Sequence, residues 1–410
     1  MKQLLNPLVW VLIILAFHVQ PVVHAQEVPD ITLASVWSLD GSHLARTSRT
    51  GSLQVWNMAS GVLELDVNPY EMVLYDIAWS PDGARIAVGA NNGDILIWDV
   101  QSGTQITTLQ SQLDAAITLD WSSDGNYLAS GSILDTRQLR LWDMRTYENV
   151  AIVGTGDTFS VAFSPTGDRV ATAGISGIRI VPVTARGVIE ADVYRPISHP
   201  GFSAVAWNTD GSQLAGTGVD GKLYIYDMTQ AIPVMFATYD ILQRPQGEMG
   251  FEWAMTIDWN AYTNSISMYD IEHGEVIVWD ITVGQEIARY ANALTMRTVV
   301  GHGFSPYGGQ LAYANNAPLS SGASTVASTN VVGAGSVSLV VPAPSPERLQ
   351  AITDACGLAP AADQALTAEI STQDYAGFTT QLEALPETAL PPGCRADLLA
   401  VAAALAAEGQ

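Results

Sequence analysis

A ten-residue segment that recurs along the chain is the feature that most constrains its fold. Clear copies begin at Val36 (VWSLDGSHLA), Ala78 (AWSPDGARIA) and Asp120 (DWSSDGNYLA), and four more follow, of which the one at Asp258 is the weakest. The aromatic residues at the second position are separated by 42, 42, 42, 44, 52 and 45 residues. These residues are Trp37, Trp79, Trp121, Phe163, Trp207, Trp259 and Phe304. Such a period fits a unit of four β-strands better than any helical repeat.

Each part of the repeat has a structural reason. Alternating residues before the aromatic predict an inner strand, and the aromatic should pack between neighbouring units. An Asp-Gly pair, such as Asp82-Gly83, then makes a tight turn because glycine tolerates positive φ. A second strand and a glycine-containing turn follow, and a third strand closes the pattern. The third strands read LQVWN from Leu53, ILIWD from Ile95, LRLWD from Leu139, LYIYD from Leu223 and VIVWD from Val276.

The ends of these third strands resemble the Trp-Asp signature of the WD40-repeat family, and the resemblance covers roughly residues 31–342. It implies an all-β, seven-bladed β-propeller over residues 26–342, with four strands in each blade. It also implies a structural role for the tryptophans of the signature. These are Trp56, Trp98, Trp142 and Trp279.

Two repeats depart from the family pattern. The third strand of repeat four reads IRIVPV (178–183) and lacks Trp-Asp. That of repeat seven reads VSLVVP (337–342) and follows a Ser/Thr/Ala/Gly-rich insertion at about 316–334. The Gly-His pair that many members carry ahead of the inner strand is also missing. The family's buried His–Asp network therefore does not carry over, and we expect apolar and aromatic contacts between blades.

The closure of the ring is left open by the sequence. In the family, the last blade usually takes its outer strand from the other end of the chain, which removes a free edge. Here the mature chain has only residues 26–30 before its first inner strand. Either the seventh blade keeps three strands, or the insertion at 316–334 supplies the fourth, or residues 21–28 do so.

The first 25 residues read as a bacterial-type signal peptide. Lys2 gives a positive start, residues 8–17 are an apolar run of ten, and Ala25 is a small residue suited to cleavage. The apolar run is short for a membrane span, which needs about 20 residues. We expect a secreted or extracytoplasmic protein with no membrane insertion after cleavage. An uncleaved N-terminal membrane anchor is the alternative.

The acidic composition limits the partners of the chain. The formal net charge is −24, from 17 Lys and Arg residues against 41 Asp and Glu residues. Such a surface repels phosphate backbones and anionic lipids, so nucleic-acid binding is disfavoured. High net charge also keeps an exported protein soluble, and this is the simpler explanation for it.

The chain changes character after residues 343–346, a proline-rich linker. Ser345 and Pro346 suit a helix N-cap and the first helical position, and apolar residues then recur at helical spacing. We expect three or four helices in a small unit over residues 347–410. Cys356 and Cys394 are the only cysteines, and a pair in an exported chain indicates a disulfide. Two buried thiols are the alternative.

The sequence carries no recognisable catalytic motif. The patterns G-x-S-x-G and H-E-x-x-H and the phosphate- and calcium-binding loop patterns are absent. Asp76, Asp120 and Asp258 on the inner strands are too scattered for a metal-binding ring, so we expect hydrogen bonds to backbone or water. His302 should be a buried structural residue, while His43 and His273 should be solvated. We therefore expect a non-catalytic protein without a cofactor or a metal.

Lengthened connections predict a binding face. The stretch from Tyr226 to Trp259 spans 33 residues, against 23 from Trp56 to Trp79, and the excess lies around residues 242–255. This connection, the one before it and the insertion at 316–334 should open on the side opposite the Asp-Gly turns, and long loops on a rigid ring often carry recognition. Aromatic, Met and Arg side chains there match interface hot spots. The candidate residues are Arg195, His199, Phe202, Arg244, Met249, Phe251 and Trp253.

Together these observations predict an exported, non-catalytic scaffold that binds a partner protein through these loops. A small core beneath the loop is the alternative role for Phe251 and Trp253. The first alternative hypothesis for the function is a glycan- or cell-wall-binding module. A propeller hydrolase is a further, weaker alternative.

Overall fold

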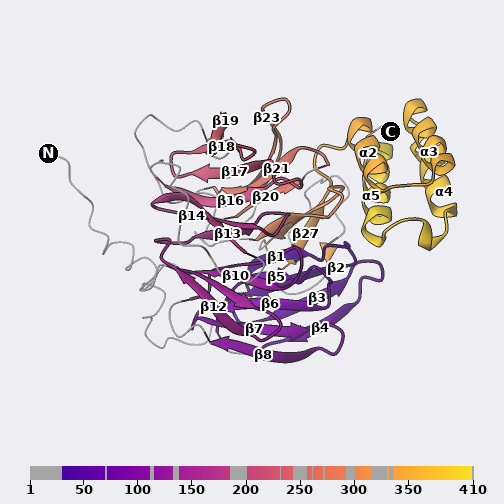
Figure 1. Ribbon diagram of the computed structural model, residues 1–410. Helices are drawn as coiled ribbons and strands as arrows, with labels where there is room; N and C mark the ends of the chain where they lie inside the picture. The colour runs from indigo at the N-terminus through magenta and orange to yellow at the C-terminus, as the bar shows by residue number, and fades with distance from the viewer. Residues whose placement is uncertain are drawn as a thin grey trace.

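The computed structural model shows a ring of seven antiparallel sheets with a helical unit at its side (Figure 1). The inner strands of successive sheets are neighbours around the ring, and the first sheet contacts the last. The expected seven-bladed propeller with a small helical unit after it is confirmed. The structure describes residues 30–69, 72–110, 115–132, 138–184, 201–230, 232–242, 256–260, 262–270, 273–291, 301–315, 330–331 and 336–408.

The strands of the first four blades pair in chain order, from the inner strand outward. Blade one holds β1 (Thr32–Trp37), β2 (His43–Ser48), β3 (Leu53–Asn57) and β4 (Leu63–Val67). Blade two holds β5 (Leu74–Trp79), β6 (Arg85–Ala90), β7 (Asp94–Asp99) and β8 (Thr104–Gln110). Blade three holds β9 (Thr118–Trp121), β10 (Tyr127–Gly131), β11 (Leu139–Asp143) and β12 (Glu148–Val153). The described strands of blade four are β13 (Ser160–Phe163), β14 (Arg169–Gly174) and β15 (Gly177–Pro182).

The remaining three blades each hold four strands. Blade five holds β16 (Phe202–Trp207), β17 (Gln213–Gly218), β18 (Lys222–Asp227) and β19 (Val234–Asp240). Blade six holds β20 (Ile257–Asn260), β21 (Ser265–Asp270), β22 (Glu275–Asp280) and β23 (Gln285–Ala291). Blade seven holds β24 (His302–Phe304), β25 (Leu311–Asn315), β26 (Asn330–Val331) and β27 (Ser336–Val340).

The Asp-Gly turns set the register of the first two strands of a blade. In blade two, Gly83 has a φ of 67°, and Asp82 accepts hydrogen bonds from the Ser80 hydroxyl and the Ala84 amide. Blades one and three repeat these bonds around their own turn aspartates. Because each strand reverses at such a turn, all of these turns lie on one side of the ring, here called the turn face. The opposite side is called the loop face.

The signature tryptophans lie in the cores of their blades. Three of them are buried, and the fourth is half-buried against an apolar core that blades five and six share. They are Trp56, Trp98, Trp142 and Trp279. Blade four has no such tryptophan, and Val181 pairs with Val170 at the corresponding position. Blade seven likewise has Val340 at this position, opposite Leu311, so these two blades have a smaller side chain where the other third strands carry Trp or Tyr.

Inner-strand tryptophans also link three of the blades to the blade before them. The indole N–H of Trp79 donates to the Val36 carbonyl over 3.1 Å, and Trp121 and Trp207 make the same kind of bond to their preceding blades. The indole N–H of Trp37, at the seam between blades seven and one, has no acceptor among the described residues, and neither has that of Trp259, at the seam between blades five and six. These two seams therefore lack a bond that three other seams have.

Blade seven completes itself. Its strands are ordered β24-β25-β27-β26, and β26 pairs antiparallel with β27, with Val331 opposite Val337. The outer strand therefore comes from the segment between the second and third strands of the same blade. Of the three closures that the sequence leaves open, the structure shows the one in which the insertion supplies the fourth strand.

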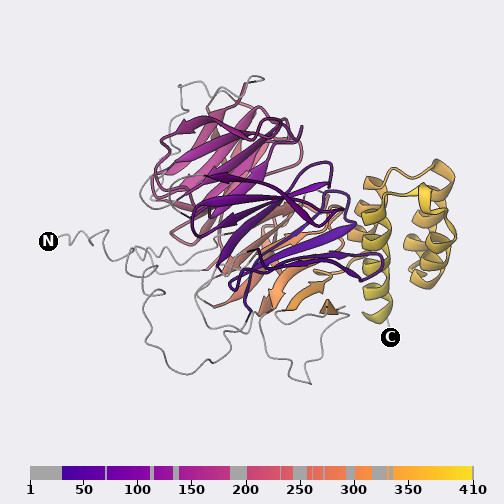
Figure 2. The same cartoon turned by 90° about the horizontal axis from the view of Figure 1, so that it is seen from below.

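The helical unit holds four α-helices and a short 3₁₀ turn. They are α2 (Pro346–Ala355), α3 (Pro360–Thr372), α4 (Tyr375–Ala384), η1 (Glu387–Ala389) and α5 (Pro392–Glu408). Ser345 caps α2, because its side chain accepts from the Arg348 amide, and Pro346 opens the helix as expected. A single apolar core joins all four helices, with α2 and α5 toward the ring and α3 and α4 outside (Figure 2). No helix among the described residues is long and apolar enough to cross a membrane.

The predicted disulfide is present. It joins Cys356, at the end of α2, to Cys394, in the first turn of α5, and their Cα atoms lie 5.9 Å apart. That separation is within the range of an ordinary disulfide. Both sulfur atoms lie in the core of the helical unit.

Candidate functional site

Six of the seven predicted partner-binding residues lie outside the described part of the chain. They are Arg195, His199, Arg244, Met249, Phe251 and Trp253. The strand ends that flank residues 243–255 are described, since β19 ends at Asp240 and β20 begins at Ile257. In a propeller blade, an outer strand ends and the next inner strand begins on the side opposite the Asp-Gly turns. The topology therefore puts both strand ends on the loop face.

Phe202 is a core residue, and its predicted place among exposed binding residues is corrected. Its side chain is 0% exposed, and its ring meets that of Tyr224 edge-on with 5.5 Å between centroids. Gly216 on the neighbouring strand β17 leaves the space that this ring fills, because a Cβ added there would lie 2.9 Å from a ring atom of Phe202. The sequence signal was Gly216 itself, a glycine inside a strand, which often marks a close approach.

The three inner-strand aspartates bridge neighbouring blades. The amide of Leu119 donates to Asp76 over 2.7 Å, that of Phe163 to Asp120 over 2.6 Å, and that of Phe304 to Asp258 over 2.7 Å. Burial raises the pKa of Asp76 to about 6 and that of Asp120 to about 7, and it also raises the pKa of Asp258. The expectation of purely apolar and aromatic seams is therefore wrong, because buried carboxylates also join the blades. The expectation that these acids bind backbone is confirmed.

No group of three or more His, Cys, Asp or Glu side chains within the described ranges could hold a metal ion. His302 is buried, and its Nδ1 lies 2.9 Å from the hydroxyl of Thr256, so its structural role is as expected. His43 is not simply solvated, because its Nε2 lies 3.0 Å from the Glu64 carboxylate and its ring lies 6.0 Å from that of Trp79. His273 is exposed and contacts Asp270.

A groove of about 590 Å³ opens on the turn face between blades two and three. Arg85 and Arg145 are its cationic lining residues, and Asp82 and Asp124 its acidic ones. Arg145 forms an ion pair with Asp143, while Arg85 lies over the Trp121 ring at 4.9 Å. Both cations are thus engaged within the ring, and the groove offers no reactive group.

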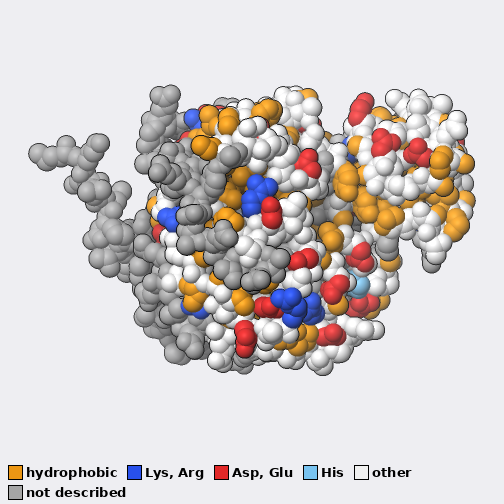
Figure 3. All heavy atoms as spheres, viewed as in Figure 1, with side chains coloured by type: hydrophobic (Ala, Val, Ile, Leu, Met, Phe, Trp, Pro, Cys, Tyr) orange, Lys and Arg blue, Asp and Glu red, His pale blue; other side chains and the backbone are white. Residues whose placement is uncertain are grey.

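The outer strand β19 carries the largest run of exposed apolar side chains among the described strands. Phe236 is 68% exposed, and Val234 and Met235 are more than half exposed. Phe236 is the extra residue of a β-bulge, because Met235 and Ala237 face consecutive residues of β18. The exposed surface elsewhere is acidic, with few Lys and Arg side chains on the face that Figure 3 shows. The strand β19 is therefore an apolar edge on an acidic molecule.

The ring, the tryptophan-bearing third strands and the seams define a WD40-like seven-bladed β-propeller. A family model described as "WD domain, G-beta repeat" matches residues 193–227. A second one, described as "Eukaryotic translation initiation factor eIF2A", matches residues 36–180, from β1 into β15. A search of curated proteins found no match. The similarity to these families therefore lies in the ring and does not reach the helical unit.

Proposed function

We propose that this protein is an exported, non-catalytic scaffold that binds a partner protein through the loop face of its ring. A WD40-like propeller suggests a protein-interaction scaffold, and propellers of the two matched families are typically non-catalytic. The observation that carries the choice of face is the place of the helical unit. It contacts the turn face at Asp40 and Ser305, so this side of the ring is partly covered. The strand ends that flank the lengthened connection at 243–255 lie on the other side.

The similarity to the eIF2A model supports the ring fold and not a role in translation. The matched segment ends in blade four, and a net charge of −24 opposes contact with RNA phosphates. The disulfide between Cys356 and Cys394 supports export, because such bonds persist in oxidising compartments.

The test of the binding face is the Trp253→Ala variant, assayed against a partner captured from an envelope extract. An aromatic hot spot at this position predicts an affinity loss of at least about 2 kcal/mol, or roughly 30-fold, with little change in melting temperature. The matched control is Phe236→Ala, which removes an exposed aromatic residue from the outer edge of the ring.

Two outcomes would contradict this proposal. If Trp253→Ala lowers the melting temperature and spares binding, Trp253 belongs to a core beneath the loop. If Phe236→Ala alone abolishes binding, the partner uses the edge strand β19 and not the loop face. Binding of the purified protein to a glycan array without any protein partner would replace the scaffold with a glycan-binding module.

Export is tested by the mass of the mature protein. We expect cleavage after Ala25, so that the intact mass begins at Gln26. We also expect a high-salt wash to release all of the mature protein from membranes, because it would have no membrane anchor. A mass that retains residues 1–25 would show an uncleaved anchor instead.

A further inference from the structure

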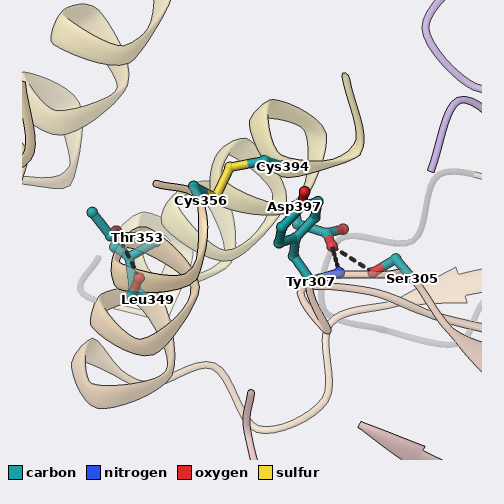
Figure 4. The surroundings of a disulfide bond; sticks show 7 residues. All are labelled: Ser305, Tyr307, Leu349, Thr353, Cys356, Cys394 and Asp397. Carbon is teal, nitrogen blue, oxygen red and sulfur yellow. Dashed lines mark hydrogen bonds between the residues drawn. A yellow bond between two sulfur atoms is a disulfide. The ribbon is translucent and has the colours of Figure 1, made fainter. Parts of the chain in front are cut away.

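The Asp-Gly turn position of blade seven lacks its aspartate. The turn reads Ser305-Pro306-Tyr307-Gly308-Gly309, so a tyrosine stands where Asp40, Asp82 and Asp124 stand in the first three blades. In those blades the serine hydroxyl donates to the aspartate of its own turn. Here the Ser305 hydroxyl donates to Asp397 of α5, over 2.7 Å (Figure 4). A helix 92 residues away in sequence therefore supplies the missing carboxylate.

Asp397 is built into this turn by several bonds. Its carboxylate also accepts from the Tyr307 amide over 3.2 Å and from the Gln310 side chain over 3.3 Å. The side chain is buried, with 1% of its residue surface exposed. A Cβ added at Gly309 would lie 2.5 Å from the Cβ of Asp397, so α5 approaches the turn as closely as a glycine permits. These contacts fix the side chain of Asp397, a residue of the helical unit, in the turn of blade seven.

A second helix holds the same turn. Arg348 of α2 donates from Nε to the Gly308 carbonyl oxygen over 3.2 Å, and its Nη2 donates to the same oxygen. Its guanidinium is buried and lies 6.0 Å from the centroid of the Phe304 ring of β24. The disulfide joins α2 to α5, so it ties together the helices that carry Arg348 and Asp397.

The first turn of α5 also reaches blade one. The Gly393 amide donates to the Asp40 carbonyl over 2.9 Å. A Cβ added at Gly41 would lie 2.7 Å from the Gly393 Cα and 3.3 Å from Pro306 of blade seven. The turns of blades one and seven and the start of α5 therefore meet at one point. The helical unit touches both sides of the seam at which the two ends of the ring meet.

We propose that the helical unit is a clasp that closes the propeller ring. Its residues Asp397 and Arg348 bind blade seven, and its residue Gly393 binds blade one. The strand order of blade seven calls for such a device. Blade seven takes its outer strand from its own insertion, so within the described residues no strand of blade one pairs with blade seven.

The sharpest test is Gly393→Ala in the full-length protein. The new Cβ would lie 2.6 Å from the Asp40 carbonyl oxygen, so α5 must move away from blade one. Alanine is also a better helix former than glycine, so the helical unit itself is not weakened. We expect amides of β1 and β24 to exchange with solvent about tenfold faster or more, while those of β9 and β10 keep their rates. The matched control is Gly154→Ala, where nothing lies within 4 Å of the added Cβ.

A second variant tests the hold on blade seven. Asp397→Ala should speed exchange at β24 and β25 and leave α3 and α4 protected. The control Glu383→Ala, on the exposed surface of α4, should leave exchange unchanged in all of these elements. Unchanged exchange at β1 and β24 in Gly393→Ala would overturn the proposal and leave the helical unit as a separate module resting on the ring. If Asp397→Ala fails to fold, the Gly393→Ala result decides alone.

Discussion

At the scale of single residues, the seams of the ring depend on buried carboxylates that the repeat pattern shows only in part. The sequence predicts that Asp76, Asp120 and Asp258 bind backbone or water, and the structure shows which backbone. For Asp76 and Asp120 the partner lies 43 residues ahead, which is about one repeat. Their hydrogen bonding to backbone was therefore predictable from the residue type. That the backbone partner lies in the next blade could be seen only in the structure.

These acids make the stability of the protein depend on pH. Their folded pKa values lie above the ordinary value of 3.8, at about 6 for Asp76 and about 7 for Asp120. Such groups contribute stability that is present below pH 3.8 and is lost as the pH rises through 6 to 7. We expect the melting temperature to rise by at least about 2–4 °C between pH 8 and pH 5 at constant ionic strength, equivalent to about 1 kcal/mol.

Below about pH 4 the trend should reverse, because the turn acids Asp40, Asp82 and Asp124 have lowered pKa values and lose their hydrogen bonds on protonation. Asp120→Ala should show a smaller rise between pH 8 and pH 5 than the parent. The control Glu148→Ala removes one exposed acid and should keep the full rise. Equal rises in both variants would assign the effect to net charge alone.

At the scale of elements, the sequence predicts the inner, second and third strands well, because an aromatic, a turn pair and a Trp-Asp ending mark each of them. The outer strands are less predictable. In β19 the bulge at Phe236 breaks the alternation, and a bulge of this kind has no signature in the residues themselves. Phe202 was misplaced because a residue at the end of a loop was assumed to be exposed. The strand that it opens buries all six of its residues.

The disulfide gives the helical unit much of its stability. It closes a loop of 38 residues, which corresponds to about 3–4 kcal/mol on the chain-entropy model. We expect Cys356→Ala combined with Cys394→Ala to unfold the helices at lower denaturant, while the strands of blades two to five keep their midpoint. Exchange rates resolved by segment measure both. A loss below about 1 kcal/mol in the helices would show that their apolar core suffices without the bond.

At the scale of the whole molecule, the sequence predicts a ring and a helical unit but not how they join. The joining contacts pair residues such as Ser305 and Asp397, which share no motif and lie far apart in the chain. Tyr307 is the one local hint, since it replaces an aspartate in an otherwise regular turn. The proposed binding face was inferred from loop length alone, and most of its candidate residues lie outside the described ranges.

The self-contained seventh blade also determines the order in which the chain can assemble. In every sheet of the described structure, each strand pairs with strands close to it in sequence, so each blade has a low contact order. A chain made from its N-terminus can complete the blades one after another without waiting for a distant strand. The contacts of blade seven with blade one, and those of α5 with blade one, are long-range. Because α5 follows blade seven in the chain, it can bind across the seam only after both of the blades that form the seam have been made. The ring can therefore form blade by blade, and the helical unit binds to it last.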